Sequence, residues 1–298
     1  MVLNRPGRIL VSYGGSGVVE LDNGAQLACT YRRAVGRPCC GDRVVVQRAA
    51  GQSAVVTGIE PRRNVFARAD ARQRKQIIAA NLDRVVIVIA PAPQPSRDLV
   101  ERYLVAVHSL GIEPVLVVNK ADLVDPATVG PESPLGRLDD YRALGYPVLT
   151  TSCKGPPGTA ELDAALRNRV SILVGQSGVG KSSLVNAVLP DLDLQTGALS
   201  RVTGKGTHTT TTTIMYALPC GGRLIDSPGV WEYGLWPLEA AELTAGFIEF
   251  RDVAARCRFN DCRHAGEPGC AVADAVAAGA IRPWRYAAYR RLLEQLQR

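Results

Sequence analysis

The chain has 298 residues, 46% of them hydrophobic and 21% charged, a composition typical of a soluble globular protein with two or three cores. The N-terminal segment MVLNRPGRIL lacks the apolar run and cleavage site of a signal peptide, and no apolar run approaches the roughly 20 residues that cross a bilayer. We therefore expect a cytoplasmic protein with no membrane partner. In that setting the eight cysteines are better explained as thiols or metal ligands than as disulfides.

Positive charge is concentrated near the N-terminus. The formal net charge of the chain is +7, and residues 1–75 carry 13 Arg and Lys against 5 Asp and Glu, a surplus of +8. Such a surplus favours a polyanionic partner, although a merely solvated basic surface would have the same composition.

Five short apolar runs, separated by Gly, Asn and Asp turns, lie between Arg8 and Ile59. Strands of this length and spacing predict a small five-stranded barrel, either of the oligonucleotide-binding type or SH3-like. The first type suits a basic surface that faces nucleic acid. The charged segment Ile59–Gln76 is predicted to be a connector.

From Arg84 the pattern changes to apolar strands that alternate with amphipathic helices. The strand-like runs RVVIVIA, PVLVVN, PVLTTS and SILV are separated by helical patterns such as DLVERYLVAVHSL and ELDAALRNR. This alternation is typical of a parallel sheet covered by helices on both faces. The segment that begins near Trp231 is mostly helical in pattern and contains a cysteine-rich loop.

The segment GQSGVGKSS, Gly175–Ser183, matches the phosphate-loop pattern G-x-x-x-x-G-K-[ST] and lies between a strand pattern and a helical pattern. Its glycines allow backbone N–H groups to surround phosphates, and the helix N-terminus adds its dipole. We expect the Lys181 ammonium to contact the β and γ phosphates and the Ser182 hydroxyl to bind Mg²⁺. The predicted phosphate-binding residues are Gly175, Gln176, Ser177, Gly178, Val179, Gly180, Lys181, Ser182 and Ser183.

Asn119-Lys120-Ala121-Asp122 follows the strand pattern PVLVV and points to guanine. The Asp122 carboxylate can accept from both N1–H and the exocyclic amine of guanine, a donor pair that adenine lacks. Ser152-Cys153-Lys154 follows another strand and is the candidate second base loop, although an ordinary polar loop would look the same. The chain has 30 Arg and only five Lys, and four of the five lie in the candidate loops, namely Lys120, Lys154, Lys181 and Lys205.

Two further segments are candidates for contact with Mg²⁺ and the γ-phosphate. Asp226-Ser227-Pro228-Gly229 follows the strand pattern RLI, so Asp226 is a candidate to hold Mg²⁺ and Gly229 to sense the γ-phosphate. In the segment GKGTHTT, either Thr209 or Thr210 is expected to meet Mg²⁺, and the sequence leaves the choice open.

The residue that orients the hydrolytic water needs a separate assignment. The residue after Gly229 is Val230, whose side chain cannot hydrogen-bond to water. His208 is the catalytic candidate in its place, because a histidine that titrates near neutrality can orient water or accept its proton.

Cys257-x4-Cys262-x-His264-x5-Cys270 supplies three thiolates and one imidazole within 14 residues. This set suits one tetrahedral structural Zn²⁺, whose closed coordination shell leaves no position for a substrate. The other cysteines show no such grouping and are expected to be free thiols or packing residues.

The order of the motifs is NKAD, SCK, GQSGVGKS, GKGTHTT and DSPG, whereas small GTPases begin with the phosphate loop. The domain is therefore circularly permuted, and the guanine-specific half precedes the phosphate loop. With the N-terminal barrel and the cysteine cluster, this order resembles the RsgA family, also called YjeQ or YloQ, of circularly permuted small-ribosomal-subunit GTPases. The resemblance covers essentially the whole chain.

The resemblance implies a multidomain fold with an oligonucleotide-binding-type barrel over 1–66, a permuted α/β GTPase domain over 67–230 and a helical zinc-binding domain over 231–298. It implies a monomer that hydrolyses GTP to GDP and phosphate, is stimulated by the 30S subunit late in maturation, and contacts 16S rRNA through the barrel and the zinc domain. The loop SCK departs from the family's commoner SAK. Two alternatives are an RNA-binding module that holds GTP without turnover and a DNA-associated protein.

Overall fold

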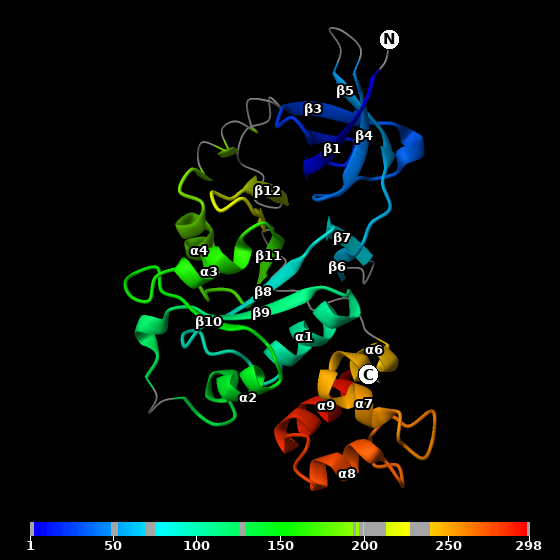
Figure 1. Ribbon diagram of the computed structural model, residues 1–298, viewed down its shortest axis with the longest axis vertical. Coiled ribbons are helices and arrows are strands. Elements are labelled where there is room, and N and C mark those ends of the chain that lie inside the picture. The colour runs from blue at the N-terminus through cyan, green and yellow to red at the C-terminus, as the bar shows by residue number, and fades with distance from the viewer. Residues whose placement is uncertain are drawn as a thin grey trace.

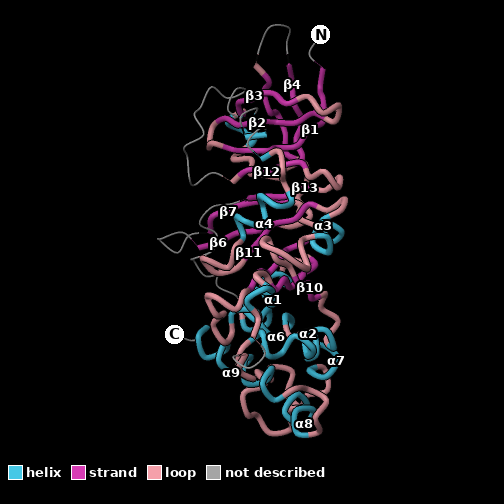
Figure 2. Tube along the Cα trace, turned by 90° about the vertical axis from the view of Figure 1, so that its left-hand side faces the viewer, coloured by secondary structure: helices cyan, strands magenta, loops and turns pink. Residues whose placement is uncertain are grey.

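Three bodies follow one another along the long axis of the molecule: a barrel, a central sheet with helices, and a helical C-terminal body (Figures 1 and 2). The computed structural model describes residues 3–48, 53–69, 75–125, 129–192, 195–196, 199, 213–226 and 239–296. A strand pairing between Val11 and Ile214 joins the barrel to the central sheet, so that the strands form one continuous 11-stranded sheet.

The N-terminal body is a closed five-stranded barrel. Its strands pair in the order β1-β2-β3-β5-β4 and back to β1, with β3 and β5 parallel and the other neighbours antiparallel. This is the strand order of the oligonucleotide-binding type, so that expectation is confirmed over the SH3-like alternative. The strands are β1 (Leu3–Ser12), β2 (Ser16–Leu21), β3 (Gln26–Tyr31), β4 (Arg43–Arg48) and β5 (Ala54–Ile59).

The expected connector contains a hairpin. Strand β6 (Val65–Ala69) pairs with β7 (Lys75–Ala80), and the end of this hairpin is bound to the barrel. Ala80 N donates to the Cys40 carbonyl over 2.9 Å, and Gly41 packs so closely that an added Cβ would lie 2.2 Å from the Ala80 carbonyl oxygen. This charged stretch of the chain therefore forms paired strands, and the barrel wall holds the end of the hairpin through backbone contacts.

The central sheet has the order β10-β9-β8-β11-β13-β12, and all its strands are parallel except β12. Strands β8 and β11 are buried along nearly their whole length, as expected for a sheet covered on both faces. The strands are β8 (Arg84–Ile89), β9 (Glu113–Val118), β10 (Val148–Thr150), β11 (Val170–Val174), β12 (Ile214–Ala217) and β13 (Arg223–Asp226).

Helices connect these strands and bury apolar side chains in the same core as the sheet. They are α1 (Leu99–Ser109), α2 (Leu138–Ala143), α3 (Ala160–Leu166) and α4 (Lys181–Val188). Short 3₁₀ turns occur at Arg33–Val35, Ala121–Leu123 and Pro134–Arg137. His108 of α1 is partly buried beside this core, and its Nε2 lies 3.0 Å from the Tyr146 hydroxyl, so this histidine has a packing role.

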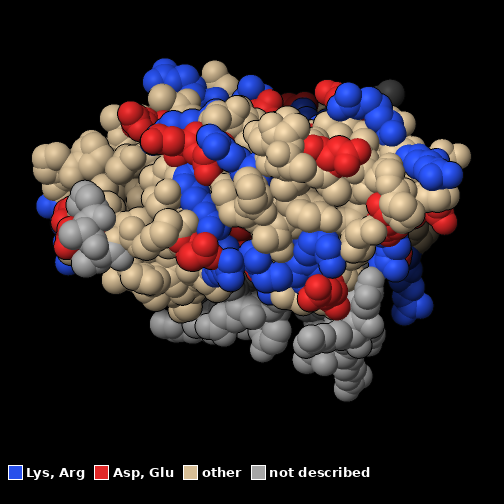
Figure 3. Space-filling view, turned by 90° about the horizontal axis from the view of Figure 1, so that it is seen from below, with Lys and Arg blue, Asp and Glu red and all other residues tan. Residues whose placement is uncertain are grey.

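The C-terminal body is helical around its own aromatic core of Phe247, Phe250 and Tyr289. Its elements are α6 (Ala240–Gly246), a 3₁₀ turn Ile248–Phe250, α7 (Arg251–Ala254), α8 (Ala271–Ala277) and α9 (Pro283–Leu296). The end of the molecule that carries this body presents groups of Lys and Arg side chains with acidic side chains between them (Figure 3). None of the helices in the described ranges combines the length and apolarity that crossing a lipid bilayer requires.

A buried arginine joins the C-terminal body to the central domain. Arg285 of α9 is 1% exposed and donates two hydrogen bonds, of 2.6 and 3.0 Å, to the Glu249 carboxylate. Its Nη1 lies 3.6 Å from Glu101 of α1, which also accepts a hydrogen bond from the Tyr141 hydroxyl. Burial raises the pKa of Glu101, while the positive charge of Arg285 opposes that rise. Each of these three charged groups is largely removed from water, so each is stabilised by its oppositely charged neighbours.

Partly buried polar contacts extend this junction along α9. Arg291 forms two hydrogen bonds, of 2.8 and 2.6 Å, with the Asp98 carboxylate just before α1. The Trp284 indole N–H donates to Asp140 over 2.8 Å. Helix α9 therefore packs against the central domain through these residues.

Replacing the buried arginine tests this junction. Arg285→Met is expected to lower the free energy of unfolding by about 3–5 kcal/mol, because it leaves Glu101 and Glu249 buried without their cation. The control is Arg142→Met, which removes a half-exposed arginine whose partner Asp139 is also exposed and should change the stability by less than about 1 kcal/mol. Denaturant unfolding measures both variants, and equal midpoints would contradict the role assigned to Arg285.

Candidate functional site

The motifs meet at one edge of the central sheet. Strands β9, β10, β11 and β13 are parallel to one another, so their carboxyl ends lie on the same side. Asn119 follows β9, Ser152 lies just beyond β10, Gly175 follows β11, and Asp226 ends β13. In open α/β sheets this edge is where ligands bind.

The phosphate loop depends on glycine at its tightest points. Gly175, Gly178 and Gly180 all have positive φ, at +144°, +80° and +93°. An added Cβ on Gly175 would lie 2.2 Å from the Val88 carbonyl oxygen, and one on Gly180 would lie 2.4 Å from Asn119 Nδ2. A side chain at either position would displace a strand or the base motif, so the loop can follow this path only with glycine.

Lys181, the first residue of α4, is held within the loop. Its side chain is 7% exposed, and its Nζ donates to the carbonyl oxygens of Gly175 over 3.0 Å and of Gln176 over 2.7 Å. The ammonium is therefore placed on the inside of the loop, at the N-terminus of a helix. A cation beside a helix N-terminus and loop N–H groups is the arrangement that binds phosphate.

Asn119 and Lys120 bind the phosphate loop directly. The Asn119 side-chain amide donates to the Val179 carbonyl over 2.9 Å and accepts from the Thr151 hydroxyl over 3.1 Å. The Lys120 ammonium donates to the carbonyls of Ala92 over 2.6 Å and Gly178 over 2.8 Å. Both side chains thus hold the base-specific strand end against the phosphate loop. The sequence singled out these two residues, but it offered no signal for Thr151 or Ala92.

Asp122 is oriented by the second base loop. The Ser152 hydroxyl donates to Asp122 Oδ1 over 2.6 Å and itself accepts from Lys154 N over 3.2 Å. Cys153 is exposed between them, and burial together with the charge of Asp122 raises the pKa of its thiol. The structure therefore brings Ser152, Cys153 and Lys154 to the carboxylate that the sequence assigns to guanine.

The other predicted residues divide into two groups. Asp226 ends β13 at the same sheet edge as the loops above. Catalytic His208, the Mg²⁺ candidates Thr209 and Thr210, and the γ-phosphate candidate Gly229 lie outside the described residues.

The base assignment can be tested at the carboxylate. Asp122→Asn is expected to weaken GTP binding and to gain binding of xanthosine triphosphate, because xanthine offers a carbonyl where guanine has an amine. Titration of both nucleotides by fluorescence or calorimetry measures the change. Asp191→Asn, an exposed carboxylate just beyond α4, should bind GTP like the wild type. Equal affinity of the wild type for ATP and GTP would overturn the assignment.

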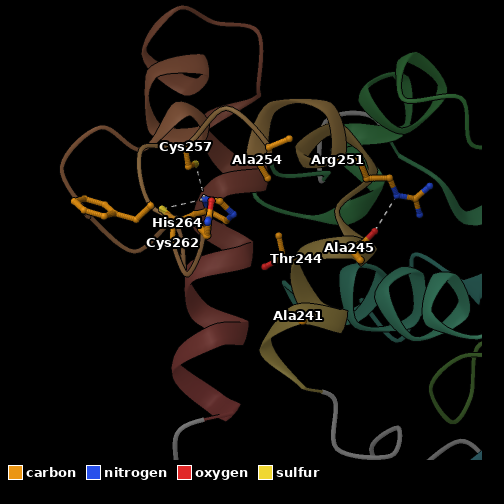
Figure 4. A pocket seen from close by; sticks show the side chains of 11 residues that line it. Ala241, Thr244, Ala245, Arg251, Ala254, Cys257, Cys262 and His264 are labelled. Carbon is orange, nitrogen blue, oxygen red and sulfur yellow. Dashed lines mark hydrogen bonds between the residues drawn. The ribbon is translucent and has the colours of Figure 1, made fainter.

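The second candidate site is the cluster Cys257, Cys262, His264 and Cys270. Each of the three Sγ atoms lies 3.5 Å from His264 Nδ1, and all four ligand atoms lie within 4.8 Å of one another. Figure 4 shows Cys257, Cys262 and His264 of this cluster. Zinc bonds of about 2.3 Å to sulfur and 2.0 Å to nitrogen, at a tetrahedral angle, place S and N roughly 3.5 Å apart. The residues therefore fit one tetrahedral zinc ion.

The loop around this cluster is supported by groups that the sequence did not single out. The Glu267 carboxylate accepts from the backbone N–H of Ala265 over 2.7 Å and of Arg263 over 3.2 Å. From α9, the hydroxyls of Tyr286 and Tyr289 donate to the carbonyls of His264 over 2.9 Å and Arg263 over 2.7 Å. The aromatic positions of the last helix were visible in the sequence, but not which loop they hold.

The protonation of the cluster also suits a metal. Burial lowers the pKa of His264, so its imidazole is neutral and available as a ligand. Burial, then the neighbouring thiols of Cys270 and Cys257, raises the pKa of Cys262 to about 12. Thiols crowded in this way release their protons when a metal ion supplies compensating charge.

Removing one thiol tests the metal site. Freshly purified protein is expected to carry one zinc per chain, and Cys262→Ser should lose it together with order in the C-terminal body, because metal binding and folding are coupled in such loops. Elemental analysis and near-ultraviolet circular dichroism measure the two losses. Cys220→Ser, outside the cluster, is the matched control and should keep its zinc. Wild-type protein without zinc would refute the assignment.

Comparison with known proteins identifies the family. Residues 59–236 match the model of the RsgA GTPase family. The chain belongs to this family. It is 46% identical over 295 residues to the small ribosomal subunit biogenesis GTPase RsgA of Azotobacter vinelandii, covering 97% of this chain and 85% of the relative. It is 46% identical over 290 residues to the Pseudomonas aeruginosa (strain LESB58) protein of the same name, with the same coverage. As an RsgA GTPase, the chain is a GTP hydrolase.

Two solved structures have the same architecture. The crystal structure of YjeQ from Thermotoga maritima is 30% identical, with a TM-score of 0.80 and 99% of both chains covered. YloQ, described as a circularly permuted GTPase, is 27% identical, with a TM-score of 0.77 and coverage of 99% of this chain and 96% of that one. The permuted order of motifs predicted from the sequence is thus confirmed at the level of the whole fold.

Proposed function

We propose that this GTPase acts in the biogenesis of the small ribosomal subunit and that binding to the 30S subunit stimulates its turnover. The observation that carries the proposal is the 46% identity, over 97% of the chain, to a protein named for that process. The site independently supports the binding of GTP. Asn119 and Lys120, from the motif that carries the Asp122 carboxylate, bind the phosphate loop at one sheet edge, and Ser152 orients Asp122 there.

The roles of the residues follow from their positions. We assign the base to Asp122, with Asn119, Lys120 and the loop 152–154 around it, and the phosphates to the loop 175–183. Mg²⁺, held by Ser182, Asp226 and either Thr209 or Thr210, supplies positive charge against the β and γ phosphates. Lys181 contributes a second positive charge, and its burial at a helix N-terminus fixes its position.

We assign 1–66 to an RNA-facing barrel, 67–230 to the GTPase domain and 231–298 to the zinc domain. The barrel and zinc domain are proposed to contact 16S rRNA. For the barrel this agrees with the composition of residues 1–75, which contain 13 Arg and Lys and only 5 Asp and Glu. The zinc ion is proposed to be structural, since four protein ligands complete its shell. The protein is proposed to act as a cytoplasmic monomer.

Phosphate release with and without 30S subunits tests both the function and the role of His208. His208→Ala is expected to keep its affinity for GTP and to lose about 10²- to 10⁴-fold in 30S-stimulated turnover, as for a lost acid–base group. The intrinsic rate should fall less. His108→Ala is the matched control, because His108 packs in α1 and should leave stimulation intact in folded protein.

The outcomes separate the alternatives. Unaltered stimulated turnover in His208→Ala would remove His208 from the mechanism. A wild-type protein that binds 30S and GTP without any turnover would instead favour an RNA-binding module that holds GTP as a structural ligand.

A further inference from the structure

The loop between the first two zinc ligands exposes an aromatic ring. Phe259 lies between Cys257 and Cys262 and is 42% exposed, which makes it the one large exposed aromatic side chain in the described ranges. Beside it is a cavity of about 480 Å³, formed by α6, α7 and the metal loop (Figure 4). Its lining includes Thr244, Asn260 and Arg251 as well as several alanines. A single exposed apolar side chain is common on protein surfaces, so the ring has to be considered together with the charges around it.

The backbone that carries this ring is held in place on both sides. Arg258 N donates to the Gly269 carbonyl over 3.0 Å, and the Phe259 carbonyl accepts from Cys262 N over 3.2 Å. Gly269 has φ +74°, and an added Cβ there would lie 3.0 Å from Arg258 Cβ, so the two segments of the loop that contain these residues pack closely. With its backbone held in this way and two metal ligands flanking it, the attachment point of the ring is in place before any partner binds.

Several exposed arginines lie in the same stretch of chain as the ring, and one of them contacts it. Arg251, Arg256, Arg258 and Arg263 are all exposed, and the Arg258 guanidinium lies 5.5 Å from the centroid of the Phe259 ring. Within the described part of the chain, Arg256, Arg258 and Arg263 form no ion pair with a carboxylate. Asp252 and Asp261 are exposed in the same stretch, whereas the Glu267 carboxylate is bound to backbone N–H groups.

We propose that Phe259 is a stacking platform for an unpaired base of single-stranded RNA, with Arg258 beside the adjoining phosphate. This inference rests on the proposed function and names the nucleic-acid contact of the zinc domain. Bases stack on aromatic side chains regardless of sequence, and the arginine next to the ring suits contact with the phosphate backbone. A protein partner that buries a large apolar face is disfavoured, because Phe259 is the one large apolar side chain exposed in the described part of this loop, and the Arg258 guanidinium lies next to it.

The test uses the full-length, zinc-loaded protein and a single-stranded RNA of about ten nucleotides that contains 2-aminopurine, whose fluorescence is quenched by stacking. Phe259→Leu keeps an apolar side chain but removes the aromatic plane, and it should weaken RNA binding by about 5- to 100-fold and abolish the quenching. Phe259→Tyr and Phe259→Trp should retain both. Leu296→Ala, which removes another exposed apolar side chain from the same domain, is the matched control and should behave as the wild type.

A second measurement locates the partner on the ribosome. Ultraviolet cross-linking of the protein to 30S subunits, followed by mass spectrometry, should find a nucleotide attached to the peptide that contains Phe259. A cross-link from this peptide to a protein instead would overturn the proposal. Zinc content equal to the wild type shows that each variant has kept its loop.

The results distinguish this inference from the proposed function. If 30S binding and stimulated turnover are normal but Phe259→Leu matches the wild type in RNA affinity and quenching, the stacking platform is refuted and the function stands. If the wild type ignores 30S but quenches the RNA probe through Phe259, the platform stands and the function is refuted.

Discussion

The contact between the base motif and the phosphate loop is the constraint on which the nucleotide site depends. Asn119 binds the Val179 carbonyl and Lys120 binds the Gly178 carbonyl. Asn119 also lies so close to Gly180 that a Cβ at that position would collide with its side chain. In a permuted chain these two motifs are separated by more than fifty residues in the reverse of the usual order. The two motifs still lie side by side, because parallel strands bring their carboxyl ends to one edge of the sheet whatever the order of the connections. Hydrogen bonds to backbone carbonyls then hold the motifs together.

The same sheet links the site to the two flanking bodies. Strand β12 pairs with β1 of the barrel at Ile214, and Arg223 of β13 forms an ion pair with Glu20 of β2 across the junction. Strand β13 ends at Asp226, so the strand that reaches the nucleotide edge also contacts the barrel. On the opposite side, α1 carries Glu101 to the buried Arg285 of α9. Each flanking body therefore contacts the GTPase domain directly, the barrel through β12 and β13 and the C-terminal body through α1.

The metal loop shows how a small domain gains order from few residues. Its four ligands lie at distances that match a tetrahedral ion, and Glu267, Tyr286 and Tyr289 hold the surrounding backbone. Supports of this kind fix ligand orientation before the metal binds, which raises affinity and limits the choice of metal. The arginines and the aromatic ring on the outside of the loop are then free to face a partner.

The sequence by itself determined the features whose signals are local. The glycines of 175–180, the ligand spacing from Cys257 to Cys270 and the alternation along β1 to β5 each reflect a requirement that nearby residues impose on one another. The permuted order of the motifs was also readable, since it needs no distances.

Only the tertiary structure decided features that depend on residues far apart in the chain. Pairing of β1 with both β2 and β4, and of β3 with β5, closes the barrel as an oligonucleotide-binding type, and no local pattern separates that closure from an SH3-like barrel. The hairpin β6–β7 begins within a segment whose charge predicted a connector, because β6 finds its partner in β7, and the end of β7 is held by the barrel. Burial of Arg285 likewise required Glu249 and Glu101 from other elements, and a charged residue in a helix pattern carries no sign of such partners.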